Sequence, residues 1–210
     1  MEKILHYLYD PLCGWCYAAE SLADSVAGQF DVRLHAGGLF ARTRLSDDKR
    51  EHIRMSDAHI GEMTGQVFSE AYLNGLLSDP ETVYDSIMPI RGVLAAESLQ
   101  PGSSLLMLKA LQRAHYRAGL RIVEMPTLVQ VAESIGLDAA LFTVAFEGIG
   151  DDVLFKHLES THALMYEVGA RGYPTFVAQV GNRFERLPHE RFYGKPEGFL
   201  RLVSAVLVQA

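Results

Sequence analysis

Cysteine is scarce in this chain, which has 210 residues and only two cysteines, Cys13 and Cys16. Small secreted proteins that rely on disulfides carry more cysteines, at wider spacing. A pair separated by two residues therefore does not indicate a structural disulfide framework. The first residues also lack the long apolar segment of a secretion signal, so we expect a reducing compartment, the cytoplasm.

Positive charge and long apolar runs are lacking as well. The chain has 26 acidic and 19 basic residues, for a net charge of -7. Sequence-independent binding to nucleic acid needs a basic surface, so we expect no nucleic-acid partner. No apolar run approaches the roughly 18 residues of a membrane-spanning helix, so we expect no membrane contact. The apolar share of 49% is that of a folded globular chain.

The first forty residues alternate between strand and helix patterns. Residues 4–9 are rich in β-formers and end at Asp10 and Pro11, which form a turn signal. Beyond the cysteines, apolar residues recur at helical spacing as far as Gly28, a plausible helix stop. Residues 32–36 then alternate between apolar and polar. This order predicts a βαβ unit whose first loop carries both cysteines.

Helical patterns fill the middle of the chain, from about residue 46 to about residue 169. Ser46, followed by two aspartates, is a good helix N-cap. Helix-like stretches follow four prolines: Pro80, Pro89, Pro101 and Pro126. No linker-like run of glycine and serine interrupts this region, so we expect a helical insertion packed against the rest.

Strand patterns return near the C-terminus. Residues 175–180 and 183–187 flank Gly181 and Asn182, which suit a type II′ hairpin because glycine adopts a positive φ. A last helix follows from about residue 195. Strands that alternate with helices predict an α/β fold with a partly parallel sheet.

The spacing of the two cysteines has a chemical rationale. A cysteine at the start of a helix meets unpaired backbone N–H groups and the positive end of the helix dipole, which favour an anion. The thiolate is the reactive form of cysteine. The two-residue spacer brings Cys16 within bonding reach of Cys13, so one sulfur can attack a disulfide and the other can resolve the mixed disulfide.

Zinc binding and simple burial account for this pair less well. A zinc site needs two further ligands at metal spacing, whereas the chain has no second CxxC motif, and His157 and His162 lie five residues apart. Both cysteines could instead be small buried apolar residues. Gly14 and Trp15 between them argue against a buried helix interior. We therefore predict no metal ligands.

Two motifs and the order of the elements together resemble a known family. They are the run DPLCGWCY at positions 10–17 and the run GYPTF at positions 172–176. The chain is similar to the DsbA-like thioredoxin-fold family, in particular to its cytosolic protein-disulfide isomerases and FrnE-like oxidoreductases. The resemblance implies a thioredoxin-fold domain from residues 1–45 and 170–210. A large helical domain, residues 46–169, is inserted between its βαβ and ββα halves.

The resemblance also implies an activity and its residues. Cys13 corresponds to the nucleophile and Cys16 to the resolving thiol of a thiol–disulfide oxidoreductase or protein disulfide isomerase. Pro174 corresponds to a cis proline that faces the disulfide, and the backbone beside it, at Tyr173, pairs with the substrate. The implied substrates are disulfide-containing proteins or small thiols. No bound cofactor is implied, and glutathione is a candidate co-substrate.

Trp15 departs from the pattern of the periplasmic DsbA oxidants, which carry histidine at this position. Tryptophan cannot supply the positive charge with which that histidine helps to stabilise the thiolate, so we expect a less oxidising pair. We expect Trp15 to be partly exposed and to contact substrate, and the alternative is a lid over the helix.

Other polar residues near these motifs have two interpretations. Asp10 could relay a proton to Cys16, or it could only stabilise the turn before Pro11. His6 alternates along a strand, which favours a structural role. Arg42 and Arg44 are expected to be solvated charges.

Two further functions remain open. One is a glutathione-dependent isomerase or transferase of the kappa-class or hydroxychromene-carboxylate isomerase type. It predicts tight glutathione binding and activity that survives loss of Cys16. That group carries serine in place of the first cysteine, which argues against it here. The other is a non-catalytic, chaperone-like binding module with an apolar groove in the helical domain, whose activity needs neither cysteine.

Overall fold

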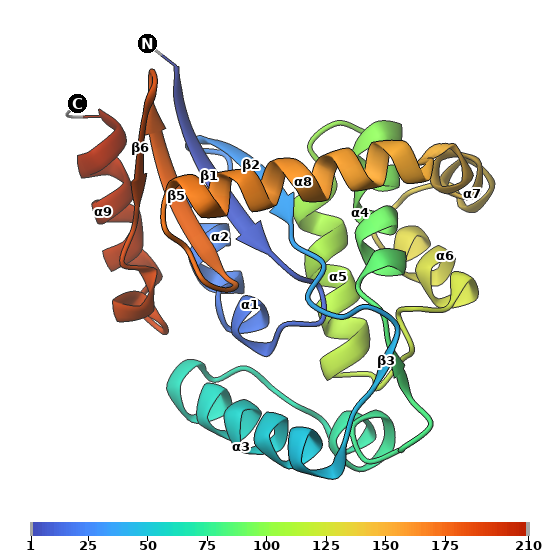
Figure 1. Ribbon diagram of the computed structural model, residues 1–210. Coiled ribbons are helices and arrows are strands. Elements are labelled where there is room, and N and C mark those ends of the chain that lie inside the picture. Colours follow the sequence, from blue (N-terminus) through green and yellow to red (C-terminus); the bar gives the residue numbers. More distant parts are fainter. Residues whose placement is uncertain (1, 209–210) are drawn as a thin grey trace.

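A four-stranded sheet in the order β2-β1-β5-β6 frames the structure, a computed structural model that describes residues 2–208 (Figure 1). The strands are β1 (Lys3–Tyr9), β2 (Asp31–Ala36), β5 (Thr175–Val180) and β6 (Arg183–Arg186). β1 pairs in parallel with β2 and antiparallel with β5, and β5 pairs antiparallel with β6. This is the predicted mixed sheet. Residues 1, 209 and 210 of the predicted thioredoxin-fold domain lie outside the described part.

Two short helices connect β1 to β2, where the apolar pattern predicts one. They are α1 (Gly14–Ala18) and α2 (Glu20–Val26), with Ala19 between them. α2 ends two residues before Gly28, whose φ of 77° is positive. Glycine adopts that angle without strain. Gly28 therefore belongs to the turn that follows the helix and is not the last residue of the helix.

Helices dominate the insert, as predicted. They are α3 (Asp47–Thr64), the π-helix η1 (Ala71–Leu76), α4 (Ile87–Leu99), α5 (Ser104–Tyr116), α6 (Met125–Ser134), α7 (Ala139–Gly148) and α8 (Asp151–Glu167). Ser46 caps α3, since its hydroxyl accepts a hydrogen bond of 3.3 Å from the Lys49 amide. α3 lies at the bottom of Figure 1, facing α1 across the end of the sheet.

The expectation of helix throughout the insert is wrong at one place. Residues Val83–Tyr84 form a strand, β4, which pairs antiparallel with β3 (Thr43–Arg44). Pro80 therefore precedes a strand instead of a helix. The partner strand lies about forty residues away, and pairing of that kind leaves no local pattern in the sequence.

The C-terminal half contains the predicted hairpin and helix. β5 and β6 meet at Gly181, whose φ is 58°, and the chain continues through the 3₁₀-helix η2 (His189–Phe192) to α9 (Pro196–Val208). α9 lies beside α2 and packs on β5. α8, the last helix of the insert, crosses the sheet and extends toward the other insert helices α4 and α7 (Figure 1).

Neighbouring residues of β1 belong to two different buried clusters of apolar side chains. Tyr7 belongs to the main apolar cluster, which also takes in Phe176 of the sheet and Phe142 of the insert. Leu8 belongs to a small cluster with Leu164 of α8. The main cluster thus runs from the sheet into the insert, and the division at residues 45 and 170 stays a prediction. Between residues 2 and 208, no helix is both long and apolar enough to cross a membrane.

Candidate active site

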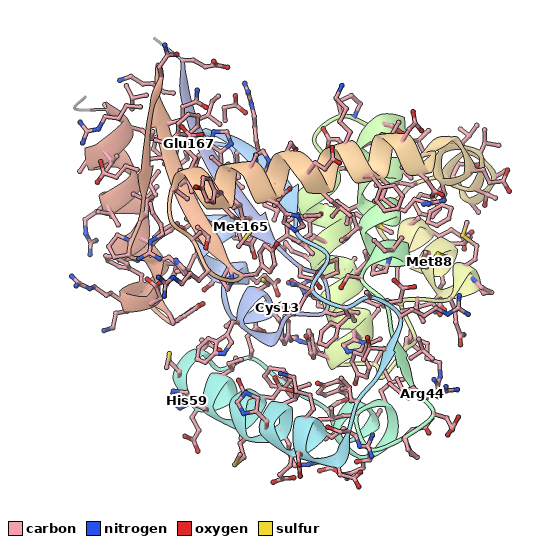
Figure 2. All side chains as sticks on the ribbon, viewed as in Figure 1. Cys13, Arg44, His59, Met88, Met165 and Glu167 are labelled. Atoms are coloured by element: carbon pink, nitrogen blue, oxygen red, sulfur yellow. The ribbon has the colours of Figure 1, made fainter. Side chains whose placement is uncertain are left out.

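Both cysteines lie where β1 gives way to α1. Cys13 is the N-cap of α1, and its carbonyl accepts hydrogen bonds from the amides of Cys16 (3.0 Å) and Tyr17 (3.1 Å). Figure 2 shows Cys13 at the start of α1, on the side toward α3. Both thiols are free. Cys13 is 7% exposed and lines a pocket, whereas Cys16 is fully buried at 0%, so Cys13 is the more accessible of the two.

Cys16 is held as a neutral thiol. Its sulfur accepts a hydrogen bond of 3.4 Å from the Asp10 amide. Burial raises the pKa of Cys16 well above its ordinary value, and the thiol of Cys13 and the charge of Asp10 raise it further. The two cysteines therefore differ in access and environment, as an attacking and a resolving thiol would.

The carboxyl group of Asp10 is fully buried and fully hydrogen bonded. Its oxygens accept bonds from the Leu12 amide (2.9 Å), the Leu39 amide (2.6 Å) and the Ser86 hydroxyl (3.0 Å). Burial raises the pKa of Asp10 to about 6. Asp10 thus joins the cysteine loop to the loop after β2 and to the start of α4. The proposed proton relay to Cys16 stays a prediction.

Tyr173 and Pro174 lie opposite the first cysteine. The Tyr173-Pro174 peptide bond is cis, as the resemblance implied. The Cys13 thiol donates a hydrogen bond to the carbonyl oxygen of Tyr173, with a sulfur–oxygen distance of 3.5 Å. The Tyr173 ring fills the space beside Gly37, where a Cβ would lie 1.8 Å from its Cζ. The absence of a side chain at Gly37 thereby sets the position of Tyr173.

Trp15, Tyr173 and Pro174 line one pocket of about 400 Å³, which we call the sheet-side pocket. Trp15 is half-buried, with its ring 5.3 Å from that of Tyr193. Arg171 and Arg186 also line this pocket and are exposed. Nothing in the sequence marked either arginine, although Arg171 precedes the GYPTF run. The substrate-binding role of Trp15, Tyr173 and Pro174 stays a prediction.

A second pocket, of about 170 Å³, lies on the other side of Trp15 and is lined in part by Cys13. We call it the insert-side pocket, because Asp57 of α3 and Tyr84 of β4 form much of its wall. Sequence reasoning missed both residues. Asp57 is one of many charged residues along α3, and no pattern distinguishes it from the exposed ones.

The remaining residues singled out from the sequence lie away from the sulfurs. His6 is buried and contacts His35 (2.8 Å) and the Gln179 side chain (2.7 Å), which fits the expected structural role. Arg42 is exposed, and Arg44 forms an exposed ion pair. Within residues 2–208, no three histidine, cysteine or acidic side chains are grouped to hold a metal ion.

Comparisons with known proteins agree with this geometry. The model of the DSBA-like thioredoxin domain family matches residues 4–191. Curated protein sequences contain no match. The chain is similar to the structure of the cytosolic disulfide reductase DsbM from Pseudomonas aeruginosa, at 38% identity and a TM-score of 0.90, covering 99% of this chain and 100% of that one. A second structure of DsbM, with GSH, matches at 38% identity and 0.86, covering 98% and 99%.

More distant structures share the fold alone. A candidate protein disulfide isomerase from Nitrosomonas europaea is 23% identical with a TM-score of 0.82, covering 100% of this chain and 98% of that one. A 2-hydroxychromene-2-carboxylate isomerase is 15% identical with a TM-score of 0.60, covering 99% of each.

The family match extends over both cysteines, the cis proline and the helical insert between them. The architecture is a DsbA-like thioredoxin fold with a helical insertion, the fold of thiol–disulfide oxidoreductases. The chain belongs to the DSBA-like thioredoxin domain family.

Proposed function

We propose that this protein is a thiol–disulfide oxidoreductase that acts as a disulfide reductase, with Cys13 as the attacking thiol and Cys16 as the resolving thiol. One observation carries the proposal. The sulfur of Cys13, the less buried of the two cysteines, lies at the start of α1, 3.5 Å from the Tyr173 carbonyl, with the thiol of Cys16 buried one turn behind it. A substrate sulfur that reaches Cys13 also reaches the backbone beside Pro174.

The proposed cycle moves two electrons to the substrate. The Cys13 thiolate attacks one sulfur of a substrate disulfide, and the other sulfur leaves and takes up a proton. Cys16 then gives up its proton and attacks the Cys13 sulfur, which releases the second substrate thiol and leaves a Cys13–Cys16 disulfide. We propose that the buried carboxyl of Asp10 accepts the proton that Cys16 gives up, because the amide of the same residue contacts the Cys16 sulfur.

Electrostatics favour a reducing pair. A dithiol becomes a strong oxidant when its surroundings stabilise the thiolate of its reduced form. Here the buried acids next to the cysteine loop are Asp10 and Asp57, whereas the basic residues that share a pocket with Cys13, Lys49 and His52, are exposed. Neither cysteine is hydrogen bonded to a basic side chain within residues 2–208. DsbM, at 38% identity, is described as a cytosolic disulfide reductase. We infer the same direction of electron flow and the same compartment, the cytoplasm.

The sheet-side pocket favours disulfides that carry acidic groups. Two arginines, Arg171 and Arg186, line it against one acidic residue, Glu190, and neither arginine forms an ion pair with another described residue. The substrates that fit are acidic stretches of a protein disulfide, or glutathione disulfide, which carries four carboxylates. The second DsbM structure is one with GSH.

Trapping tests the proposal. The variant Cys16→Ala should hold substrates from a lysate as mixed disulfides at Cys13, and the double variant Cys13→Ser, Cys16→Ala is the matched control. Purified protein should also reduce glutathione disulfide and a disulfide-containing test protein. Glutathione-dependent activity that survives in Cys16→Ala would favour the glutathione-dependent isomerase. Non-covalent binding of the same proteins by the double variant would favour the non-catalytic binding module.

A further inference from the structure

The insert-side pocket is separate from the sheet-side pocket, with Trp15 common to both walls. Its volume of about 170 Å³ is that of roughly five or six waters. A molecule the size of one amino acid fits such a space. Cys13 is part of its wall, so a group held there lies beside this residue.

Asp57 places a buried acid in this pocket. It is 3% exposed, and its Oδ1 lies 2.6 Å from the position that a Cβ on Gly14 would take. The Tyr72 hydroxyl donates a hydrogen bond of 2.8 Å to Oδ2. Burial raises the pKa of Asp57 to about 7. Asp57 forms no ion pair with another residue of the described chain, so its charge lacks a cation.

The groups around Asp57 come from three further elements. Tyr72 belongs to η1, Tyr84 to β4 and Tyr116 to α5, and all three also line the pocket. On α3 itself, Arg54 lies near enough to lower the pKa of Asp57 slightly, but its guanidinium bonds to the Leu73 carbonyl and the Ser78 hydroxyl. No other cationic group approaches the carboxyl from these elements.

Tyr84 supplies a second observation. It is 4% exposed, its hydroxyl has no hydrogen-bond partner, and it lines both this pocket and a smaller cavity beside His115. A buried polar group without a partner costs about 1–3 kcal/mol, so such a hydroxyl indicates an acceptor that completes the site. The pocket is also lined by Lys49 and His52, which are exposed residues of α3. One pocket therefore offers an unpaired acid, an unpaired hydroxyl and a basic mouth.

We propose that the insert-side pocket binds the amino-acid head of a small zwitterionic thiol, with the ammonium at Asp57 and the carboxylate toward Lys49 and His52. The thiol's sulfur then lies beside Cys13. This inference rests on the proposed function, because it assigns the reductant that returns the oxidised Cys13–Cys16 pair to its dithiol form. The disulfide substrate and the reducing thiol would use opposite sides of Trp15.

Two small thiols return the disulfide to the dithiol form. The bound thiol loses its proton and its sulfur attacks Cys13, which breaks the Cys13–Cys16 bond, and Cys16 takes up a proton. A second small thiol loses its proton and its sulfur attacks the sulfur of the first, which releases a small disulfide and frees the Cys13 thiolate to take up a proton. Two thiols are oxidised to one disulfide, and the protein gains two electrons.

A series of thiols that differ in charge tests this assignment. Oxidised protein is mixed with cysteine, cysteamine, 2-mercaptoethanol or 3-mercaptopropionate, and reduction is followed by the fluorescence of Trp15, the single tryptophan. Rates are divided by each thiol's thiolate concentration. Asp57→Asn should slow cysteine and cysteamine by about tenfold, the effect of losing one buried charge pair, and change the other two by less than about twofold.

Three matched variants complete the test. Tyr72→Phe keeps the carboxyl but removes a hydrogen bond that lowers its pKa, so the preference for ammonium thiols should remain and move to higher pH. Tyr84→Phe removes the unpaired hydroxyl and should slow cysteine more than 2-mercaptoethanol. Lys49→Gln, at an exposed position, should slow cysteine and 3-mercaptopropionate but not cysteamine. If Asp57→Asn does not fold, Lys49→Gln and the thiol series on the unsubstituted protein still test whether the pocket recognises the ammonium and the carboxylate.

Two results would overturn the inference. One is an unsubstituted protein that does not distinguish cysteamine from 2-mercaptoethanol. The other is an equal change for all four thiols in Asp57→Asn, which would mean that Asp57 acts on Cys13 and not on the ligand. A failure of every thiol to reduce the protein is a different result, and it would contradict the proposed function itself.

Discussion

The sulfur of Cys13 lies 3.5 Å from the carbonyl oxygen of Tyr173, a residue 160 positions further along the chain. The sheet creates this contact, because β1 and β5 pair antiparallel and Leu8 lies opposite Thr175. The end of β1 leads into the cysteine loop, and the start of β5 follows the cis proline. The reactive sulfur and the proposed substrate-binding backbone thus meet at one edge of the sheet.

Gly37 lies against the ring of Tyr173, the residue whose backbone carbonyl contacts Cys13. A Cβ at Gly37 would lie 1.8 Å from the ring of Tyr173, so Gly37→Ala must displace that residue. Forced side chains in packed sites typically cost about 1–3 kcal/mol. We expect a loss of stability in that range, and a fall in disulfide reduction of at least about tenfold because Tyr173 leaves Cys13.

Gly148→Ala is the matched control for this substitution. Gly148 lies at the end of α7, and a Cβ there meets nothing within 4 Å. We expect its stability and its rate of disulfide reduction to equal those of the unsubstituted protein. Equal activity in Gly37→Ala and Gly148→Ala would show that the position of Tyr173 does not matter for the reaction.

The two cysteines should differ in reactivity in the reduced protein. Cys13 is 7% exposed and lines a pocket, whereas Cys16 is fully buried and its pKa is raised well above the ordinary value. Iodoacetamide at neutral pH should therefore modify Cys13 at least about tenfold faster than Cys16, as measured by mass spectrometry of peptides. Cys13→Ser should abolish exchange, and Cys16→Ser should form stable mixed disulfides. Equal rates of modification would contradict the assigned roles.

Three histidines between the sheet and α8 should make the fold sensitive to acid. His6 contacts His35 at 2.8 Å, and His157 accepts a hydrogen bond from the Ala36 amide. Burial lowers the pKa of all three, that of His35 to about 4. The unfolded chain, with an ordinary histidine pKa near 6.5, binds these protons first. Stability is therefore present above pH 6.5 and lost as the pH falls toward 4.

His35→Gln isolates this contribution. Urea unfolding at several pH values should show that the unsubstituted protein loses up to about 3 kcal/mol more than His35→Gln between pH 6.5 and pH 4. Comparison with the variant removes the contributions of other groups. Identical pH dependence of the two proteins would mean that His35 is not kept neutral by the fold.

Asp10 should give stability the opposite pH dependence to that of the histidines. Burial raises its pKa to about 6, so the folded protein holds this proton more tightly than the unfolded chain. The stability that Asp10 provides is thus complete below its ordinary pKa and lost as the pH rises through about 6. A difference of about two units corresponds to roughly 3 kcal/mol. Asp10→Asn should be less stable at pH 4, because it loses acceptors, and should lack this fall between pH 4 and pH 7.

Hydrogen bonding explains why Asp10→Asn also tests the position of the loops. The carboxyl accepts bonds from two backbone amides and the Ser86 hydroxyl, and one amide oxygen cannot replace all three. A variant as stable as the unsubstituted protein at pH 4 would contradict the role of Asp10 as a link between loops.

The parts of the site that the sequence could predict are those encoded by local motifs. The CxxC pair after a strand and the GYPTF run before another strand each have a short signature, and the mixed sheet follows from the order of the elements. The cis bond before Pro174 follows the same resemblance. These features depend on residues close together in the chain.

The parts that the sequence could not predict depend on contacts between distant segments. Asp57 becomes a pocket residue only because α3 packs against α1 at Gly14, where there is no side chain to keep it away. β4 forms where β3 lies next to it: Val83 and Tyr84 are good strand formers, but a run of two residues gives no strand pattern. Arg186 reaches the pocket through the hairpin register. No periodicity reports such contacts.

A redox titration tests the central claim most directly. Protein is equilibrated in glutathione buffers of known ratio, and the fluorescence of Trp15, which lies between the two cysteines in sequence and lines the pocket of Cys13, reports the disulfide. We predict a single two-electron transition at a potential well below the roughly −120 mV of DsbA, because within residues 2–208 no basic side chain is hydrogen bonded to either sulfur to stabilise a thiolate. A transition near −120 mV would contradict the reductase assignment, and no transition at all would contradict the exchange chemistry of Cys13 and Cys16.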